Sequence, residues 1–277
     1  MLRRLAKIVL ALGVAGYIAA AGYMAINQRA FIFRVEPAVP VLANAGLPNA
    51  VETTFTAPDG TRLTGWHIDP SRAEVPVFVY FHGNAGNLMR RAERFRLMTA
   101  GGAGLLAFHY RGYGGSGGVP GEDELHRDAA AIYAEAERRF PGHKLIIFGE
   151  SLGTGVATRL AITAPAAGLI LDSPFMSVQD RAEATYAWLP VGLLINHPFR
   201  SDQAIAKVRM PLLVLHGARD MIVPISDGER LFALASEPKT FVRYADAGHV
   251  GAFRFGAMND IQRFLKEKLG LNVQKSD

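Results

Sequence analysis

The chain has 277 residues, and 30 Lys and Arg against 25 Asp and Glu give a formal net charge of +5. Hydrophobic residues make up 49% and charged residues 20% of the chain, which excludes a disordered, collagen-like or coiled-coil protein. Because the chain has no cysteine, disulfides, thiolate metal sites and a cysteine nucleophile are also excluded.

The N-terminal segment has the pattern of a membrane span. The basic stretch Arg3–Lys7 precedes an uncharged apolar run, Ile8–Ile26. As a helix rising about 1.5 Å per residue, this run would span about 28 Å, close to the hydrocarbon thickness of a bilayer. We predict that residues 1–27 form a transmembrane signal anchor, with the basic end cytoplasmic and the rest extracytoplasmic. The alternative is a signal peptide cleaved after Ala19–Ala21, which would release a secreted or periplasmic protein.

Beyond this run the chain alternates strand-like and helix-like segments. Residues 28–50 predict a linker, residues 51–271 one α/β domain and residues 272–277 a tail. The predicted strands are Val51–Thr56 and Arg62–Ile68, which form a hairpin, followed by Val75–Phe81, Gly104–His109, Lys144–Phe148, Gly168–Leu171, Leu212–Leu215 and Thr240–Tyr244. The predicted helices are Arg90–Ala100, Asp123–Phe140, Thr154–Thr163, Ser226–Ala235 and Asn259–Leu269.

The strands after the hairpin are uniformly apolar and are separated by helical segments. Strands of this kind are buried on both faces, so the pattern predicts a mostly parallel sheet covered by helices on both sides. Ligands of such sheets bind beyond the carboxyl ends of the strands. Residues 176–204 are irregular and apolar, and we predict that they form a small cap.

Ser151 stands in the pentapeptide Gly149–Gly153, between an apolar strand and a helix of small residues. A sharp strand–turn–helix connection raises the serine hydroxyl above the sheet, and the two glycines let neighbouring backbone pass closely. The start of the following helix favours developing negative charge. This context predicts that Ser151 is a nucleophile rather than an incidental turn residue.

A serine nucleophile needs a base, and in this architecture the acid and then the histidine follow the serine along the chain. His249, just after the last predicted strand, is predicted to take the hydroxyl proton. Asp220, in the loop after Leu212–Leu215, is predicted to hold the imidazole tautomer and to stabilise the imidazolium. Asp172 and Asp246 are the alternatives for this acid.

The oxyanion that forms at an attacked carbonyl needs two preorganised N–H donors. The backbone N–H groups of Leu152, next to the nucleophile, and of Asn84, in the loop after Val75–Phe81, are predicted to supply them. In the alternative interpretation, the Asn84 side chain only stabilises the turn in which it lies. Apolar residues of the cap are predicted either to line an acyl pocket or to pack beneath the cap: Met176, Trp188, Leu189, Val191, Leu193, Leu194 and Ile195.

The segments HGNAGN, HYRGYGGSGG, GESLGTG, DSPF, HGARDMIVP and the final GH resemble the serine-hydrolase branch of the α/β-hydrolase superfamily. More narrowly, they resemble membrane-anchored α/β-hydrolase-domain proteins and serine-aminopeptidase-like hydrolases. The resemblance implies an eight-stranded, mostly parallel sheet and a triad of Ser151, Asp220 and His249. It also implies hydrolysis of esters, thioesters or amides without a cofactor. Eukaryotic proteins of this kind act on lipids, as lysophospholipid lipases and protein depalmitoylases.

We therefore expect hydrolysis of an ester or thioester with an apolar, lipid-like acyl group, through an acyl-enzyme. An aminopeptidase or amidase is the first alternative. Its substrate amine would need an acidic anchor, for which Glu150 and Asp172 are candidates. A non-catalytic binding module is the second alternative.

Other motifs predict no cofactor, metal or nucleic-acid partner. Gly112–Gly117 matches a dinucleotide-binding loop, but Pro120-Gly121 interrupts the helix that such a loop requires. His82 and His109 lack accompanying carboxylates and are predicted to be satisfied polar residues at strand ends. We predict a solvated helix face that contains Arg90, Arg91, Arg94 and Arg96. The alternative is that these arginines bind phosphate or an anionic bilayer surface.

Overall fold

The computed structural model describes residues 1–273, which contain one eight-stranded sheet of order β1-β2-β4-β3-β5-β6-β7-β8. The strands are β1 Ala50–Thr56, β2 Arg62–Ile68, β3 Val77–Phe81, β4 Gly104–Phe108, β5 Leu145–Glu150, β6 Gly168–Asp172, β7 Leu212–Gly217 and β8 Lys239–Tyr244. The β1–β2 and β2–β4 pairs are antiparallel, and the other five pairs are parallel. The predicted mostly parallel sheet of eight strands is confirmed.

Helices cover both faces of the sheet. They are α2 Ala92–Thr99, α3 Glu122–Arg139, α4 Leu152–Leu160, α8 Ile225–Leu234 and α9 Ala257–Leu269. Short 3₁₀ helices are η1 Leu42–Ala45, η2 Leu88–Arg91, η3 Ile205–Lys207 and η4 Ala252–Phe255. Most of the predicted boundaries lie within two residues of these. The largest difference is in α4, which ends at Leu160 rather than Thr163. The opening residues of the first predicted helix form η2 instead.

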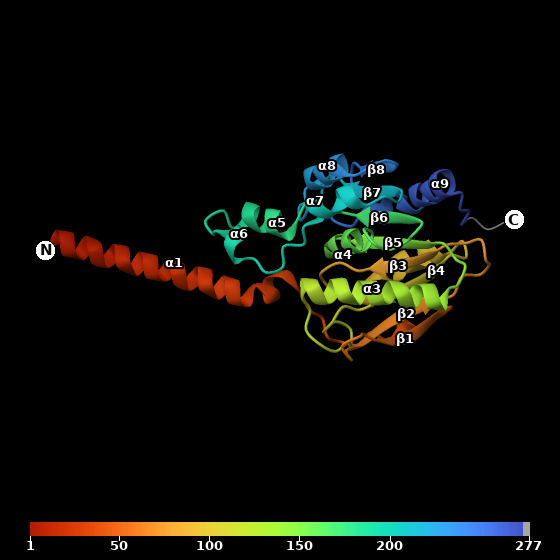
Figure 1. Ribbon diagram of the computed structural model, residues 1–277, viewed down its shortest axis with the longest axis horizontal. Coiled ribbons are helices and arrows are strands. Elements are labelled where there is room, and N and C mark those ends of the chain that lie inside the picture. The colour runs from red at the N-terminus through yellow and green to blue at the C-terminus, as the bar shows by residue number, and fades with distance from the viewer. Residues whose placement is uncertain (274–277) are drawn as a thin grey trace.

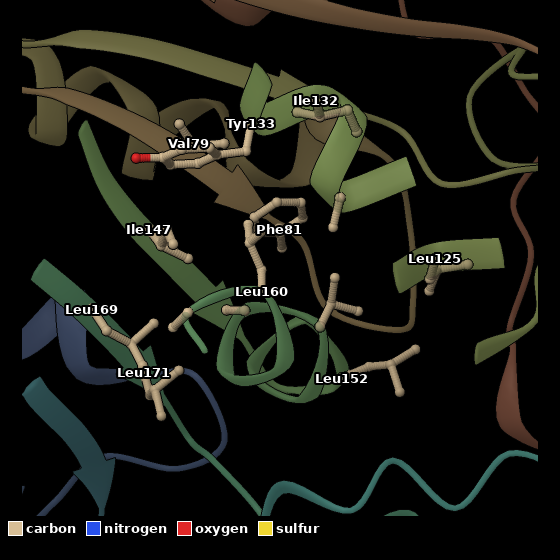
Figure 2. Close-up of a cluster of buried hydrophobic side chains, with 14 of the residues drawn as sticks. Val79, Phe81, Leu125, Ile132, Tyr133, Ile147, Leu152, Leu160, Leu169 and Leu171 are labelled. Atoms are coloured by element: carbon tan, nitrogen blue, oxygen red, sulfur yellow. The ribbon is translucent and has the colours of Figure 1, made fainter. Parts of the chain in front are cut away.

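Alternate side chains of each buried strand point into two separate apolar cores. In β3, Val79 and Phe81 belong to the core under α3 and α4, and Figure 2 shows Phe81 between Ile132 of α3 and Leu160 of α4. Phe78 of the same strand belongs to the other core, with side chains of α2 and α9. This explains why the strands read as continuous apolar runs, since both of their faces are removed from water.

The N-terminal helix, α1 Leu2–Ile32, projects away from the domain (Figure 1). In residues 1–273 it is the one helix long and apolar enough to cross a membrane, with a mean hydropathy of 1.9. It continues beyond the predicted end at residue 27, because Gln28, Arg29 and Ala30 are good helix formers and no proline occurs before Pro37. A signal sequence would have the same features, so the anchor, its topology and the division into domains stay predictions.

The segment predicted as an irregular cap contains three short helices, α5 Val178–Thr185, α6 Val191–Leu194 and α7 Ser201–Ala204. The hydroxyl of Ser177 caps α5 by accepting the N–H of Asp180 at 2.8 Å. Helices this short depend on packing more than on intrinsic propensity, which is why the sequence pattern did not indicate them.

Candidate active site

The turn at Ser151 joins β5 directly to α4. Ser151 has φ 50° and ψ −118°, a conformation that is costly for a residue with a side chain. A Cβ on Gly153 would lie 2.1 Å from the carbonyl oxygen of Phe81, and one on Gly149 would lie 2.7 Å from that of Gly153. Both glycines of the pentapeptide are therefore required by close backbone packing around the serine.

The structure brings the three predicted triad residues into contact. His249 Nε2 lies 2.9 Å from Ser151 Oγ, and His249 Nδ1 lies 2.7 Å from Asp220 Oδ2. With its proton on Nδ1, the imidazole donates to the carboxylate and leaves Nε2 free to accept the serine proton. Both distances are within the range that proton transfer requires.

Asp220 follows β7, and its side chain is fully buried. Its Oδ1 accepts the backbone N–H groups of Ile222 at 2.9 Å and Val223 at 2.8 Å. Burial by itself would raise the pKa of this carboxyl, but hydrogen bonds from His216, His249 and Val223 outweigh it and hold the pKa well below its usual range. A carboxylate therefore faces the imidazole at neutral pH.

The two alternative acids have other partners. Asp172, at the end of β6, is buried and pairs with Arg94 at 2.9 Å. Asp246 is exposed on the surface and pairs with Arg219 at 2.8 Å. Within residues 1–273 neither carboxylate hydrogen-bonds His249, so the geometry favours Asp220 as its partner.

The two predicted oxyanion donors lie beside the serine. Leu152 is the first residue of α4, and the N–H groups of a first helical turn have no partner inside the helix. Asn84 lines the same cavity as Ser151 and Leu152. Its side-chain Oδ1 accepts the N–H of Arg34 at 2.8 Å and the hydroxyl of Tyr113 at 3.2 Å, which fixes the loop. The donation of both backbone N–H groups to an oxyanion stays a prediction.

The prediction of a solvated basic face is wrong for two of its four arginines. Arg90 and Arg96 are exposed, but Arg91 and Arg94 are buried. Arg91 binds the Glu150 carboxylate through Nη2 at 2.6 Å and Nε at 3.2 Å. Arg94 lies 3.5 Å from the same carboxylate and bridges it to Asp172. These two guanidinium groups are therefore ion-pair partners beneath the Ser151 turn.

This cluster ionises Glu150 in spite of its burial. Burial would raise the pKa of the Glu150 carboxyl, but Arg91 and Arg94 outweigh it and hold the pKa well below its usual range. Tyr80 also donates its hydroxyl to Glu150. Because all of these groups are buried, each depends on the others for its charge or its proton. The cluster fixes the residue that precedes the nucleophile.

We expect Glu150→Gln to destabilise the fold by about 3–5 kcal/mol, because it leaves buried guanidinium groups without a matching charge. The measurement is the urea midpoint of the full chain in detergent micelles. Glu93→Gln is the matched control, since Glu93 pairs with Arg96 on the exposed side of the same region. Equal midpoints for the two variants would contradict a structural role for Glu150.

An apolar cavity of about 300 Å³ opens above Ser151. Of the predicted pocket residues, Leu189, Val191, Leu194 and Ile195 line it. Trp188 and Leu193 lie outside the cavity and are exposed, and Met176 packs against the core. The sequence did not predict the second wall, which α1 provides through Met24, Ala25, Gln28, Phe31 and Ile32.

His82 and His109, the two histidines predicted at strand ends, have structural partners. His82 donates Nδ1–H to the carbonyl of Gly83 at 2.7 Å and accepts the Tyr110 N–H at Nε2. His109 accepts the Leu88 N–H at 3.1 Å, and burial lowers its pKa to about 4. Both are therefore neutral at physiological pH. Within residues 1–273, no three His, Cys, Asp or Glu residues gather in a way that could hold a metal ion.

The sheet and the serine turn define an α/β hydrolase, and comparisons with known proteins agree. A family model described as "Serine aminopeptidase, S33" matches residues 73–201. The chain is 37% identical over 226 residues to an uncharacterized protein of Mycobacterium tuberculosis, covering 80% of each chain. The chain belongs to the α/β-hydrolase superfamily.

Two further comparisons involve proteins with named activities. The lysophosphatidylserine lipase ABHD12 of Danio rerio is 32% identical over 195 residues, which are 63% of this chain and 51% of that one. The crystal structure of an esterase from Pyrococcus furiosus matches with a TM-score of 0.70 and 20% identity, covering 86% of this chain and 99% of the esterase. The esterase therefore shares the fold, and the lipase also shares sequence.

Proposed function

We propose that this protein is a serine hydrolase that cleaves carboxylic esters or thioesters of apolar acyl groups through an acyl-enzyme. The observation that carries this proposal is the hydrogen-bonded chain from Ser151 Oγ through His249 to Asp220, at the base of an apolar cavity. The esterase and lipase relatives support the same class of substrate.

In the proposed reaction, Ser151 Oγ attacks the carbonyl carbon while His249 Nε2 takes the hydroxyl proton. The backbone N–H groups of Leu152 and Asn84 stabilise the oxyanion of the tetrahedral intermediate. As this intermediate collapses, the imidazolium gives its proton to the departing alcohol or thiol. Water, deprotonated by the same imidazole, then attacks the acyl-enzyme carbonyl. As the bond to Ser151 Oγ breaks, the imidazolium returns the proton to this oxygen and the acid is released.

An aminopeptidase is the weaker candidate because no acidic side chain for a substrate ammonium group lines the cavity in residues 1–273. The two acids considered for that role, Glu150 and Asp172, are buried and paired with Arg91 and Arg94. Among the residues that line the cavity in the described part of the chain, the charged one is the cation Arg181. Arg181 pairs with Asp227 at 3.4 Å, so this side chain offers no negative charge to an amine, and the apolar lining favours an acyl group.

A substrate panel tests the proposal on the full chain in detergent micelles. We expect kcat/KM for p-nitrophenyl esters to rise about three- to fourfold for each added methylene until the cavity is filled, since a buried methylene contributes about 0.8 kcal/mol. Aminoacyl p-nitroanilides, which carry a free amine, should be turned over far more slowly. Faster turnover of the anilides would instead support the aminopeptidase.

A further inference from the structure

The end of the cap does not stand free in solvent but lies against α1. We call residues 186–195 the cap tip. The hydroxyl of Tyr17 donates to the carbonyl oxygen of Trp188 at 3.1 Å, and the two rings meet edge to face at 6.0 Å. Near the other end of the tip, Gln28 Nε2 donates to the carbonyl of Leu194 at 3.2 Å. Figure 1 shows α5 and α6 alongside the C-terminal part of α1.

These contacts place the cap tip at the depth of the apolar run of α1. Tyr17 lies midway along Ile8–Ile26, about 14 Å from either end at 1.5 Å per residue. A helix that spans the bilayer with this run carries Tyr17 near the middle of a hydrocarbon layer about 30 Å thick. Because Trp188 contacts Tyr17, the cap tip reaches into the same layer.

The side chains of the cap tip suit a hydrocarbon environment. Between Glu183 and Arg200 the chain has no Asp, Glu, Lys or Arg. Leu193 is 87% exposed and Trp188 is 52% exposed, beside apolar α1 residues that are exposed as well. Adjacent exposed apolar surface of this kind marks an interaction site, and its continuity with a membrane-spanning helix points to lipid as the partner.

Much of the backbone of the cap tip is hydrogen-bonded within the protein, as lipid requires of irregular structure. In hydrocarbon, peptide groups have no water to bind and must be satisfied within the protein. Backbone carbonyls inside the tip accept the N–H groups of Leu189, Val191, Leu193 and Ile195. The side chains of Tyr17 and Gln28 donate hydrogen bonds to the carbonyls of Trp188 and Leu194. In a water-exposed loop, solvent would bind such carbonyls.

We propose that the cap tip inserts into the bilayer leaflet on the side of the hydrolase domain. The cavity above Ser151 is walled by this tip and by α1 from Met24 to Ile32, so its mouth faces the same leaflet. The substrate is then an acyl lipid taken from that leaflet rather than a water-soluble ester, and this part of the inference rests on the proposed function. The insertion itself is independent of catalysis.

Tryptophan fluorescence tests the insertion. The chain has two tryptophans; Trp66 is buried at 2% exposure, so quenching from outside reports on Trp188. The full chain with Ser151→Ala is reconstituted in phosphatidylcholine vesicles that contain acyl chains brominated at chosen depths. The Trp188 signal is obtained by subtracting the spectrum of the same chain with Trp188→Phe. We expect the bromolipids to remove most of this signal and aqueous iodide to leave it intact.

A matched control moves the tryptophan to the amino-terminal ends of the parallel strands, away from Ser151. Lys144 is exposed just before β5, whereas Ser151 follows the other end of that strand. With Trp188→Phe and Lys144→Trp combined, iodide should quench and bromolipid should not. Quenching of Trp188 by iodide alone would place the cap tip in water, and quenching by neither agent would mean that a protein partner covers it. Either result overturns the insertion.

The lipid substrate has its own test with Leu193→Glu, which puts a charge on the cap tip outside the cavity lining. We expect the rate on long-chain lipid esters in vesicles to fall relative to the rate on p-nitrophenyl acetate in solution, because the charge opposes insertion. An unchanged ratio would contradict substrate uptake from the leaflet. If the parent chain turned over neither substrate, the result would instead count against the proposed hydrolase.

Discussion

Replacing Ser151 by alanine is expected to lower kcat for p-nitrophenyl ester hydrolysis by roughly 10⁶-fold, the loss found when the nucleophile of a serine triad is removed. The reason is that His249 then has no hydroxyl to deprotonate, and no acyl-enzyme can form. Initial rates measure the loss. A fluorophosphonate probe, which bonds covalently to an activated serine, should label the parent chain and not the variant.

The control for this experiment is Ser71→Ala. Ser71 is exposed in the connection between β2 and β3, at the ends of the strands opposite the site. It should keep both the rate and the labelling of the parent. If Ser151→Ala retained its labelling, the nucleophile would be another residue and the acyl-enzyme at Ser151 would be refuted.

The features that the sequence predicted well are those with local physical causes. The apolar strands are visible because both faces of a parallel strand are buried. The serine turn is visible because a Cβ at Gly149 or Gly153 would collide with neighbouring backbone, so both positions require glycine. Asp220 and His249 lie in contact because loops after parallel strands meet at the same ends of a sheet, and their catalytic roles stay predictions.

The buried ion pairs were missed because they join distant parts of the chain. Arg91 and Glu150 are 59 positions apart, and a helix rich in arginine resembles a solvated face when it is judged by its own residues. A signal was nevertheless present. Glu150 ends a buried strand, and a buried carboxylate needs a cation, which Arg91 and Arg94 can supply from one helix-like stretch.

The contribution of α1 to the cavity has no counterpart in the linear pattern. The apolar run predicts a span, but the same composition suits an isolated helix and one that packs against a cap. The hydrogen bonds of the Gln28 side-chain amide with the backbone of Leu194 and Asn196 distinguish the packed helix from the isolated one. These two residues lie far from Gln28 along the chain. Such a contact depends on the folded domain, so the α1 residues were predicted only as anchor and linker.

Asp220→Asn is expected to lower kcat by about 10⁴-fold with little loss of folding, the effect known for the equivalent change in a serine triad. The asparagine oxygen can still accept the N–H groups of Ile222 and Val223. Its amide NH₂ then faces His249 Nδ1 and makes that nitrogen the acceptor. The ring proton moves to Nε2, where it blocks uptake of the Ser151 proton.

The two rival carboxylates provide the comparison that makes this result decisive. Asp246→Asn removes an exposed ion pair with Arg219 and should leave kcat near that of the parent, because surface pairs contribute little. Asp172→Asn removes a buried partner of Arg94, so we expect a lower urea midpoint but a much smaller loss of kcat per folded molecule than in Asp220→Asn. The reverse order, with Asp172→Asn the slowest folded variant, would move the acid to β6. The hydrogen bond between His249 and Asp220 would then be structural, and the imidazole would have to turn toward Arg94 and its carboxylate partners during the reaction.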